Sequence, residues 1–130
     1  AEADVLVLDT LGELAGLYRL ARLAFIGGTL VPTGGHNPIE AARFGVPVVV
    51  GPSMENFREI AESFDAADAW RRAADARDLG RAFRELAADP DGARALGERG
   101  RALVEASRGA LARTLELVAP LVARAAGSAA

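Results

Sequence analysis

The chain of 130 residues has no cysteine and no lysine, and its only histidine is His36. Without cysteine the chain cannot form a disulfide, a thiolate nucleophile or a cysteine-based metal site. A single histidine cannot build a histidine metal cluster. Because all 15 basic residues are arginines, Schiff-base chemistry is excluded, and a cationic contact to phosphate must come from arginine or a helix N-terminus.

Long apolar runs and an excess of positive charge are also missing. No run approaches the length of a membrane span, and the acidic first residues, 1–4, do not resemble a signal peptide. The formal net charge of -3 disfavours nucleic-acid binding, which normally requires a basic face. With 51% hydrophobic residues the chain is too apolar to be disordered. We therefore predict one soluble domain over residues 1–124 and a frayed tail over residues 125–130.

Short apolar runs alternate with helix signals in the first half of the chain. The runs 5–8, 23–26 and 46–50 are typical of strands buried on both faces, and a weaker fourth strand is expected over residues 67–70. Each of the first three runs precedes a capping-box pair: Thr10 with Glu13, Asn37 with Glu40, and Asn56 with Glu59. This alternation predicts the α/β class, with a Rossmann-like parallel sheet flanked by helices.

The second half of the chain reads as helix. A first helix is expected from Asp75, a second restarts at Asp89-Pro90, and a separate last helix follows, which Pro120 should bend or weaken. Apolar residues lie along one face of each helix: Leu79, Phe83 and Leu86; Leu96 and Leu103; and Leu111, Leu115, Val118 and Val122.

The stretch from Thr33 to Ala42 carries the strongest ligand signal. Gly34 and Gly35 allow the backbone to turn its N–H groups outward, and Asn37 is a good N-cap for a helix that should end near Gly45. Free amides and the positive end of the helix dipole together bind phosphate. In a parallel sheet this loop shares the carboxyl edge of the strands with the other strand-to-helix loops, where ligands bind.

Two residues of this stretch have alternative roles. Glu40 either completes a capping box or accepts hydrogen bonds from the ribose hydroxyls of a bound nucleotide. His36 either shapes the loop or donates a hydrogen bond to a phosphate. The residue pattern leaves both alternatives open.

Four spaced motifs make the pattern more specific. They are residues 9–14, 25–30 and 34–40, and Gly51-Pro52 with Asn56-Phe57. In this order they resemble the 3-deoxy-D-manno-octulosonic-acid (Kdo) transferases, glycosyltransferases that move Kdo from CMP-Kdo to a lipid A precursor in lipopolysaccharide synthesis. That family has a GT-B architecture of two Rossmann-like domains. The similarity runs from about Asp4 to Val122 and covers part of the C-terminal, donor-binding domain.

The resemblance implies a set of donor-binding residues. Those at the CMP phosphate would be Gly34, Gly35, His36 and Asn37; Glu40 would lie near the ribose and Asn56 beside the donor; and Gly27, Gly28 and Thr29 would shape the pocket wall. Amides of residues 35–37 would neutralise the leaving phosphate, with no metal or other cofactor. Two residues depart from the family pattern: Ser53 stands where a histidine is common, and Thr29 where serine is usual.

The resemblance also implies what this chain lacks. The general base of the family is a glutamate of the N-terminal domain. No catalytic residue is therefore expected in this chain, which should bind nucleotide weakly and not turn over. The parent protein would associate with the cytoplasmic face of the bacterial inner membrane and take its lipid A precursor through the N-terminal domain.

Two other interpretations remain. One is a different GT-B enzyme that acts on a UDP-sugar, either a transferase or an epimerase, because the same helix start accepts any nucleotide phosphate. The other is a non-catalytic nucleotide-binding module, or one that only docks on another domain.

Overall fold

The centre of the fold is a sheet of three short parallel strands, in a computed structural model that describes residues 4–127. The strands β1 (Ala24–Phe25), β2 (Val48–Val50) and β3 (Arg71–Arg72) lie in that order. Val49 of β2 is paired with Phe25 on one side and with Arg71 on the other. The predicted α/β class with a parallel sheet is therefore confirmed.

Helices cover both faces of the sheet. Val48 and Val50 are buried in one core cluster together with residues of α2 (Ile39–Ala42), α3 (Arg58–Ala66) and α5 (Pro90–Gly127). Val49 points to the other face, where α4 (Ala76–Ala88) packs on it. Because successive side chains of a strand point to opposite faces, the run of three valines supplies both layers of the core.

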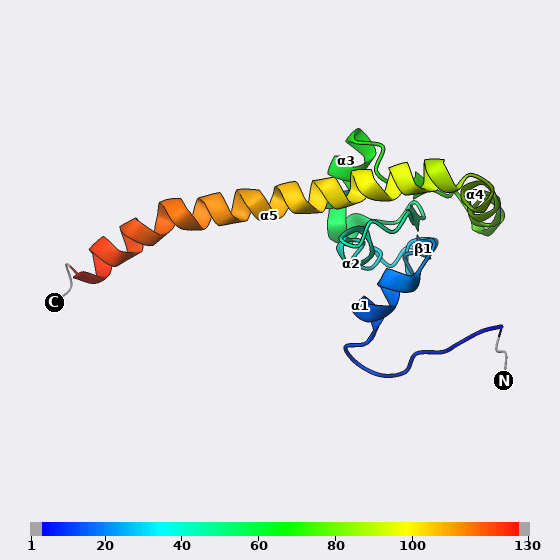
Figure 1. The fold of residues 1–130 in the computed structure, drawn as a ribbon, viewed down its shortest axis with the longest axis horizontal. Helices are drawn as coiled ribbons and strands as arrows, with labels where there is room; N and C mark the ends of the chain where they lie inside the picture. The colour runs from blue at the N-terminus through cyan, green and yellow to red at the C-terminus, as the bar shows by residue number, and fades with distance from the viewer. Residues whose placement is uncertain (1–3, 128–130) are drawn as a thin grey trace.

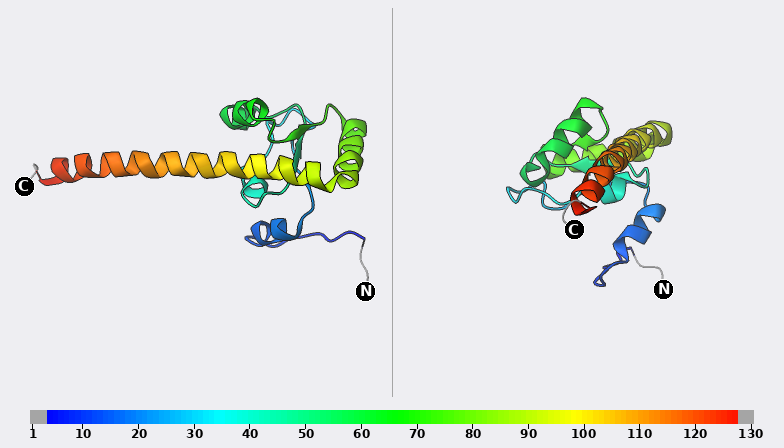
Figure 2. Two further views of the ribbon diagram at one scale, coloured as in Figure 1. Left: turned by 45° about the horizontal axis from the view of Figure 1, so that its top comes forward. Right: turned by 90° about the vertical axis from the view of Figure 1, so that its left-hand side faces the viewer.

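The helix α5 is longer than expected. We predict a break between a helix that starts at Pro90 and a separate last helix, but α5 runs without interruption from Pro90 to Gly127. The helix continues through Gly109 among good helix formers, because a glycine within a helix costs only about 1 kcal/mol relative to alanine. Pro120 also lies inside the helix. Figures 1 and 2 show its C-terminal half projecting beyond the other elements.

The first predicted strand is not formed. Residues 5–8 have no regular structure, and Val5, Leu6 and Val7 are 78–79% exposed. In Figure 1 the segment runs away from the sheet. A strand needs a neighbour to pair its backbone groups, and within residues 4–127 the sheet consists of β1, β2 and β3 alone. An apolar run alone is therefore not sufficient to predict that residues 5–8 form a strand.

Two predicted helix caps are wrong. The helix α1 (Leu14–Leu17) begins three residues after the expected start, and the Thr10 hydroxyl hydrogen-bonds the Glu13 carboxylate instead of a backbone amide. A 3-10 turn, η1 (Tyr18–Leu20), follows it. Asn56 lies inside another 3-10 turn, η2 (Glu55–Phe57), and α3 begins only at Arg58 without a side-chain cap. In both places the side chain of the expected cap, Thr10 or Asn56, forms a hydrogen bond with a group other than an amide of the helix start.

The predictions for β3 and for the start of α4 are closer to the structure. The expected fourth strand exists, but β3 begins at Arg71, just after the predicted range 67–70. The expected start of α4 is confirmed, because Asp75 accepts a hydrogen bond of 2.8 Å from the Asp78 amide. Within the described residues, no helix combines the length and apolar character that crossing a membrane requires.

Candidate nucleotide-binding site

Two loops meet at the carboxyl edge of the sheet, the loop between β1 and α2 and the loop after β2. The Ser53 amide donates to the Thr29 carbonyl at 2.9 Å, and the Asn56 amide donates to the Gly34 carbonyl at 3.1 Å. In the other direction, the Gly34 amide donates to Ser53 Oγ at 3.0 Å. The predicted convergence of the strand-to-helix loops is thus present for these two loops.

Thr29 joins the ends of the two strands. Its side chain is fully buried, and its hydroxyl donates to the Ile26 carbonyl at 2.6 Å and accepts from the Gly51 amide at 2.8 Å. The hydroxyl therefore already has a donor and an acceptor partner within the protein. Thr29 therefore fixes the start of the loop that follows β1.

The glycine turn is fixed by its neighbours. Gly34 and Gly35 have φ angles of 85° and 76°, a conformation that glycine adopts without strain. A Cβ at Gly34 would lie 2.4 Å from Nδ2 of Asn56, and one at Gly35 would lie 2.9 Å from the Ser53 carbonyl oxygen. The Gly35 amide donates to the Gly28 carbonyl at 3.1 Å. Both glycine amides therefore already have acceptors within the protein.

The start of α2 keeps free donors beyond the turn. The helix begins at Ile39 rather than at Asn37, but the Asn37 side chain accepts a hydrogen bond of 3.0 Å from the Ile39 amide, as an N-terminal cap does. Within the described residues, the amides of His36 and Asn37 have no hydrogen-bond partner. The helix ends at Ala42, shortly before Gly45, whose φ is 71°. The predicted end near Gly45 is therefore confirmed.

Glu40 lies exposed in the first turn of α2. The hydrogen bonds of the described residues include none from the Asn37 amide to the Glu40 carboxylate, so the second half of the predicted capping box is not formed. The charge of Glu40 also affects Tyr18. Burial raises the pKa of the Tyr18 hydroxyl, and the nearby Glu40 carboxylate raises it further. Glu40 therefore presents a free carboxylate beside the loop.

His36 lies against the first pair of glycines. A Cβ at Gly28, where φ is 70°, would lie 3.2 Å from Cδ2 of His36 and 3.0 Å from the Thr33 hydroxyl. A Cβ at Gly27 would lie 3.7 Å from the same ring atom. The imidazole thus packs on the Gly27-Gly28 backbone, which supports the loop-shaping role, while the exposed side chain keeps the phosphate role open.

Asn56 contacts the glycine turn from the loop after β2. Its Nδ2 donates to the Thr33 carbonyl at 3.2 Å, in addition to the backbone bond from its amide to Gly34. The side chain is exposed. The side-chain amide of Asn56 therefore contacts the loop between β1 and α2.

Sequence reasoning missed the hydrogen bonds that link Ser53 to Gly34 and to Glu55. The Ser53 side chain is buried, and its hydroxyl donates to Oε2 of Glu55 at 2.7 Å while it accepts from the Gly34 amide. The hydrogen bond from Ser53 holds the pKa of the Glu55 carboxyl below its ordinary value, with a further contribution from a backbone hydrogen bond. Gly34 and Ser53 are 19 positions apart, so no local pattern pointed to this contact.

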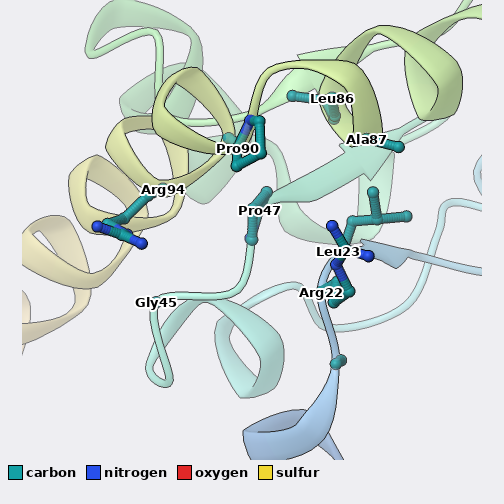
Figure 3. Close-up of a pocket in the computed structure, with 10 residues that line it drawn as sticks. Arg22, Leu23, Gly45, Pro47, Leu86, Ala87, Pro90 and Arg94 are labelled. Atoms are coloured by element: carbon teal, nitrogen blue, oxygen red, sulfur yellow. The ribbon is translucent and has the colours of Figure 1, made fainter.

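Two cavities in the described part of the chain lie away from these loops. One, of about 430 Å³, is lined by residues that precede β1 and β2, among them Leu23 and Pro47, and by Pro90 and Arg94 (Figure 3). It is at the amino edge of the strands, opposite the two loops. The other, of about 760 Å³, lies between α2, α3 and α5. Neither is lined by a predicted donor-binding residue.

No family model matches the chain. Among curated proteins, it is 43% identical to the 3-deoxy-D-manno-octulosonic acid transferase of Bordetella pertussis over 87% of this chain and 26% of that protein. It is 36% identical to the enzyme of that name from Haemophilus influenzae over 93% of this chain and 29% of that protein.

A solved structure agrees with these relatives. The fold is similar to the crystal structure of the C-terminal CMP-Kdo binding domain of WaaA from Acinetobacter baumannii, with a TM-score of 0.70 and 34% identity over 75% of this chain and 51% of that one. The chain thus spans little more than a quarter of the length of its curated relatives. In sequence and in fold the chain is therefore similar to the C-terminal domain of Kdo transferases.

Proposed function

We propose that this chain is part of the CMP-Kdo-binding domain of a glycosyltransferase that transfers Kdo to a lipid A precursor in lipopolysaccharide synthesis. The observation that carries the proposal is the similarity, in both sequence and fold, to a solved CMP-Kdo binding domain. Conserved fold alone does not define function, so the geometry of the two loops has to be compatible with a nucleotide sugar.

The geometry supports a phosphate site at the start of α2. The amides of Gly34 and Gly35 are occupied by Ser53 and Gly28, which leaves the amides of His36 and Asn37 as the donors next to the turn. We propose that these two amides receive the CMP phosphate. As the bond between Kdo and this phosphate breaks, fixed N–H donors would stabilise the negative charge on the departing CMP.

Glu40 is the proposed contact to the ribose. Its carboxylate is exposed in the first turn of α2, and a carboxylate can accept hydrogen bonds from both ribose hydroxyls. Gly27, Gly28 and Thr29 would form the wall of the pocket, and Asn56 would lie beside the donor. In this proposal His36 and Asn56 also keep the loop in shape.

The transfer step requires residues outside this chain. In the proposed GT-B enzyme, the general base and the acceptor site belong to an N-terminal domain, and the whole protein works at the cytoplasmic face of the bacterial inner membrane. The 130-residue chain should therefore bind CMP and not catalyse transfer. Product formation by this chain alone would contradict that division of roles.

A nucleotide titration tests the proposal. The amide resonances of residues 34–41 would be followed by two-dimensional NMR while CMP, UMP or inorganic phosphate is added. Shifts at His36, Asn37 and Glu40 that saturate with CMP at lower concentration than with UMP support a cytidine-specific donor site. Equal responses to CMP and UMP would instead favour an enzyme that uses another nucleotide sugar, and no response would contradict the proposed site.

A further inference from the structure

Ser53 occupies a central position between the two loops. Its side chain is 6% exposed, its backbone amide donates to Thr29, and its hydroxyl accepts from the Gly34 amide. Thr29 and Gly34 are at the beginning and end of the segment that carries the glycine turn. One residue therefore holds this segment at both of its ends.

The hydrogen-bond direction at Ser53 is defined by Glu55. The carboxylate of Glu55 can only accept, so the Ser53 hydroxyl proton points to it over 2.7 Å. The lone pairs of the same oxygen then face the Gly34 amide at 3.0 Å. An exposed glutamate thus orients a buried hydroxyl, and the hydroxyl holds the amide of a glycine, a residue type that can adopt many backbone conformations.

We infer that Ser53 is a positioning residue for nucleotide binding, which fixes Gly34 and so aims the amides of His36 and Asn37 at the phosphate. The inference rests on the proposed function, since it assigns the phosphate to these amides. Ser53 would act through Gly34 and not touch the nucleotide.

The expected effect follows from the loss of one buried hydrogen bond. In Ser53→Ala the Gly34 amide has no acceptor, and the turn samples other conformations. A typical hydrogen bond corresponds to about a fivefold to tenfold change in an equilibrium constant. The dissociation constant for CMP should therefore rise about fivefold to tenfold.

The experiment compares Ser53→Ala with the matched control Ser63→Ala. Ser63 is exposed on α3, and its hydroxyl donates to the Glu59 carbonyl at 2.9 Å, outside the two loops. CMP affinity and hydrogen exchange of the Gly34 amide are measured for the 130-residue chain and both variants, at a temperature where all three are folded. We expect weaker CMP binding and faster Gly34 exchange in Ser53→Ala alone.

A third variant separates positioning from folding. Glu55→Ala removes the acceptor that orients the Ser53 hydroxyl at an exposed position, so it should weaken CMP binding less than Ser53→Ala and leave the resonances of α4 and α5 unchanged. If Ser53→Ala binds CMP like the unmodified chain, or weakens binding without faster Gly34 exchange, the inference is overturned. If the unmodified chain itself does not bind CMP, both the proposed function and this inference fail.

Discussion

The buried hydroxyl of Thr29 accepts a 2.8 Å hydrogen bond from the amide of Gly51 and so ties the end of β1 to the end of β2. Both loops of the candidate site start from this point. Replacement of Thr29 by valine keeps the shape but leaves Gly51 and the Ile26 carbonyl without partners. We expect Thr29→Val to lower the free energy of unfolding by about 1–3 kcal/mol in urea denaturation.

Thr29→Ser is the matched control for this prediction. Serine keeps both hydrogen bonds and removes only one buried methyl group, which costs about 1 kcal/mol. Equal stability of the valine variant and the unmodified chain would show that the hydroxyl does not tie the strands together.

Glu55 supplies a pH-dependent contribution to stability. Because the hydrogen bond from Ser53 lowers the pKa of Glu55 in the folded chain, the ionised carboxylate stabilises the fold above its ordinary pKa. This stabilisation is lost as pH falls through the folded-state pKa. In Ser53→Ala we expect the pKa of Glu55 to move up toward its ordinary value, measured by NMR titration of the carboxyl carbon. A pKa that stays unchanged in this variant would contradict the assigned cause.

Gly34 should tolerate no side chain. In Gly34→Ala the left-handed backbone costs about 1–2 kcal/mol, and the new Cβ would overlap the side chain of Asn56. We expect a loss of CMP binding in addition to the loss of stability. Gly12→Ala is the control, because Gly12 has a φ of 90° and no atom within 4 Å of an added Cβ. If both variants lost the same stability and bound CMP equally well, the contact with Asn56 would have no role.

Glu40 should contribute to nucleotide affinity through its charge. Glu40→Gln keeps the size of the side chain and weakens its bonds to ribose hydroxyls, and hydrogen bonds to charged groups are worth about 1.5–3 kcal/mol. The neutral amide of glutamine still forms hydrogen bonds worth about 1 kcal/mol, so the dissociation constant for CMP, measured by calorimetry, should rise about fivefold. Inorganic phosphate should bind to both forms alike. Glu59→Gln, at the same position of α3 as Glu40 holds in α2, should leave CMP binding unchanged.

The clearest sequence signals concerned residues whose structure depends on their neighbours in the chain. The start of α4 at Asp75 is one example, since the acceptor and the donor are three residues apart. Val48, Val49 and Val50 are another, because a continuous apolar run between glycine and proline signals is typical of a central parallel strand. These local patterns were sufficient to give the class of the fold.

Contacts between distant residues decided what sequence could not predict. Asn56 fits the pattern of a helix cap, yet its side chain donates a hydrogen bond to the Thr33 carbonyl, 23 positions away. The amides of Gly34 and Gly35 fit a phosphate nest, yet they are satisfied by Ser53 and Gly28. Residues 5–8 fit a strand, but no partner lies beside them in the described part of the chain. Each outcome depends on which partner is near in space.

The projecting half of α5 makes rotational diffusion of this chain anisotropic. At 1.5 Å per residue, the 38 residues of α5 extend over about 57 Å, whereas a compact chain of this length has a radius of gyration of about 14 Å. The N–H bonds of α5 lie along the long axis of the molecule, so their transverse relaxation will be faster than that of the N–H bonds in the two loops. The loop N–H bonds point in many directions. Linewidths of α5 will report the tumbling of the long axis, and those of Gly34 to Ala41 will report the binding site.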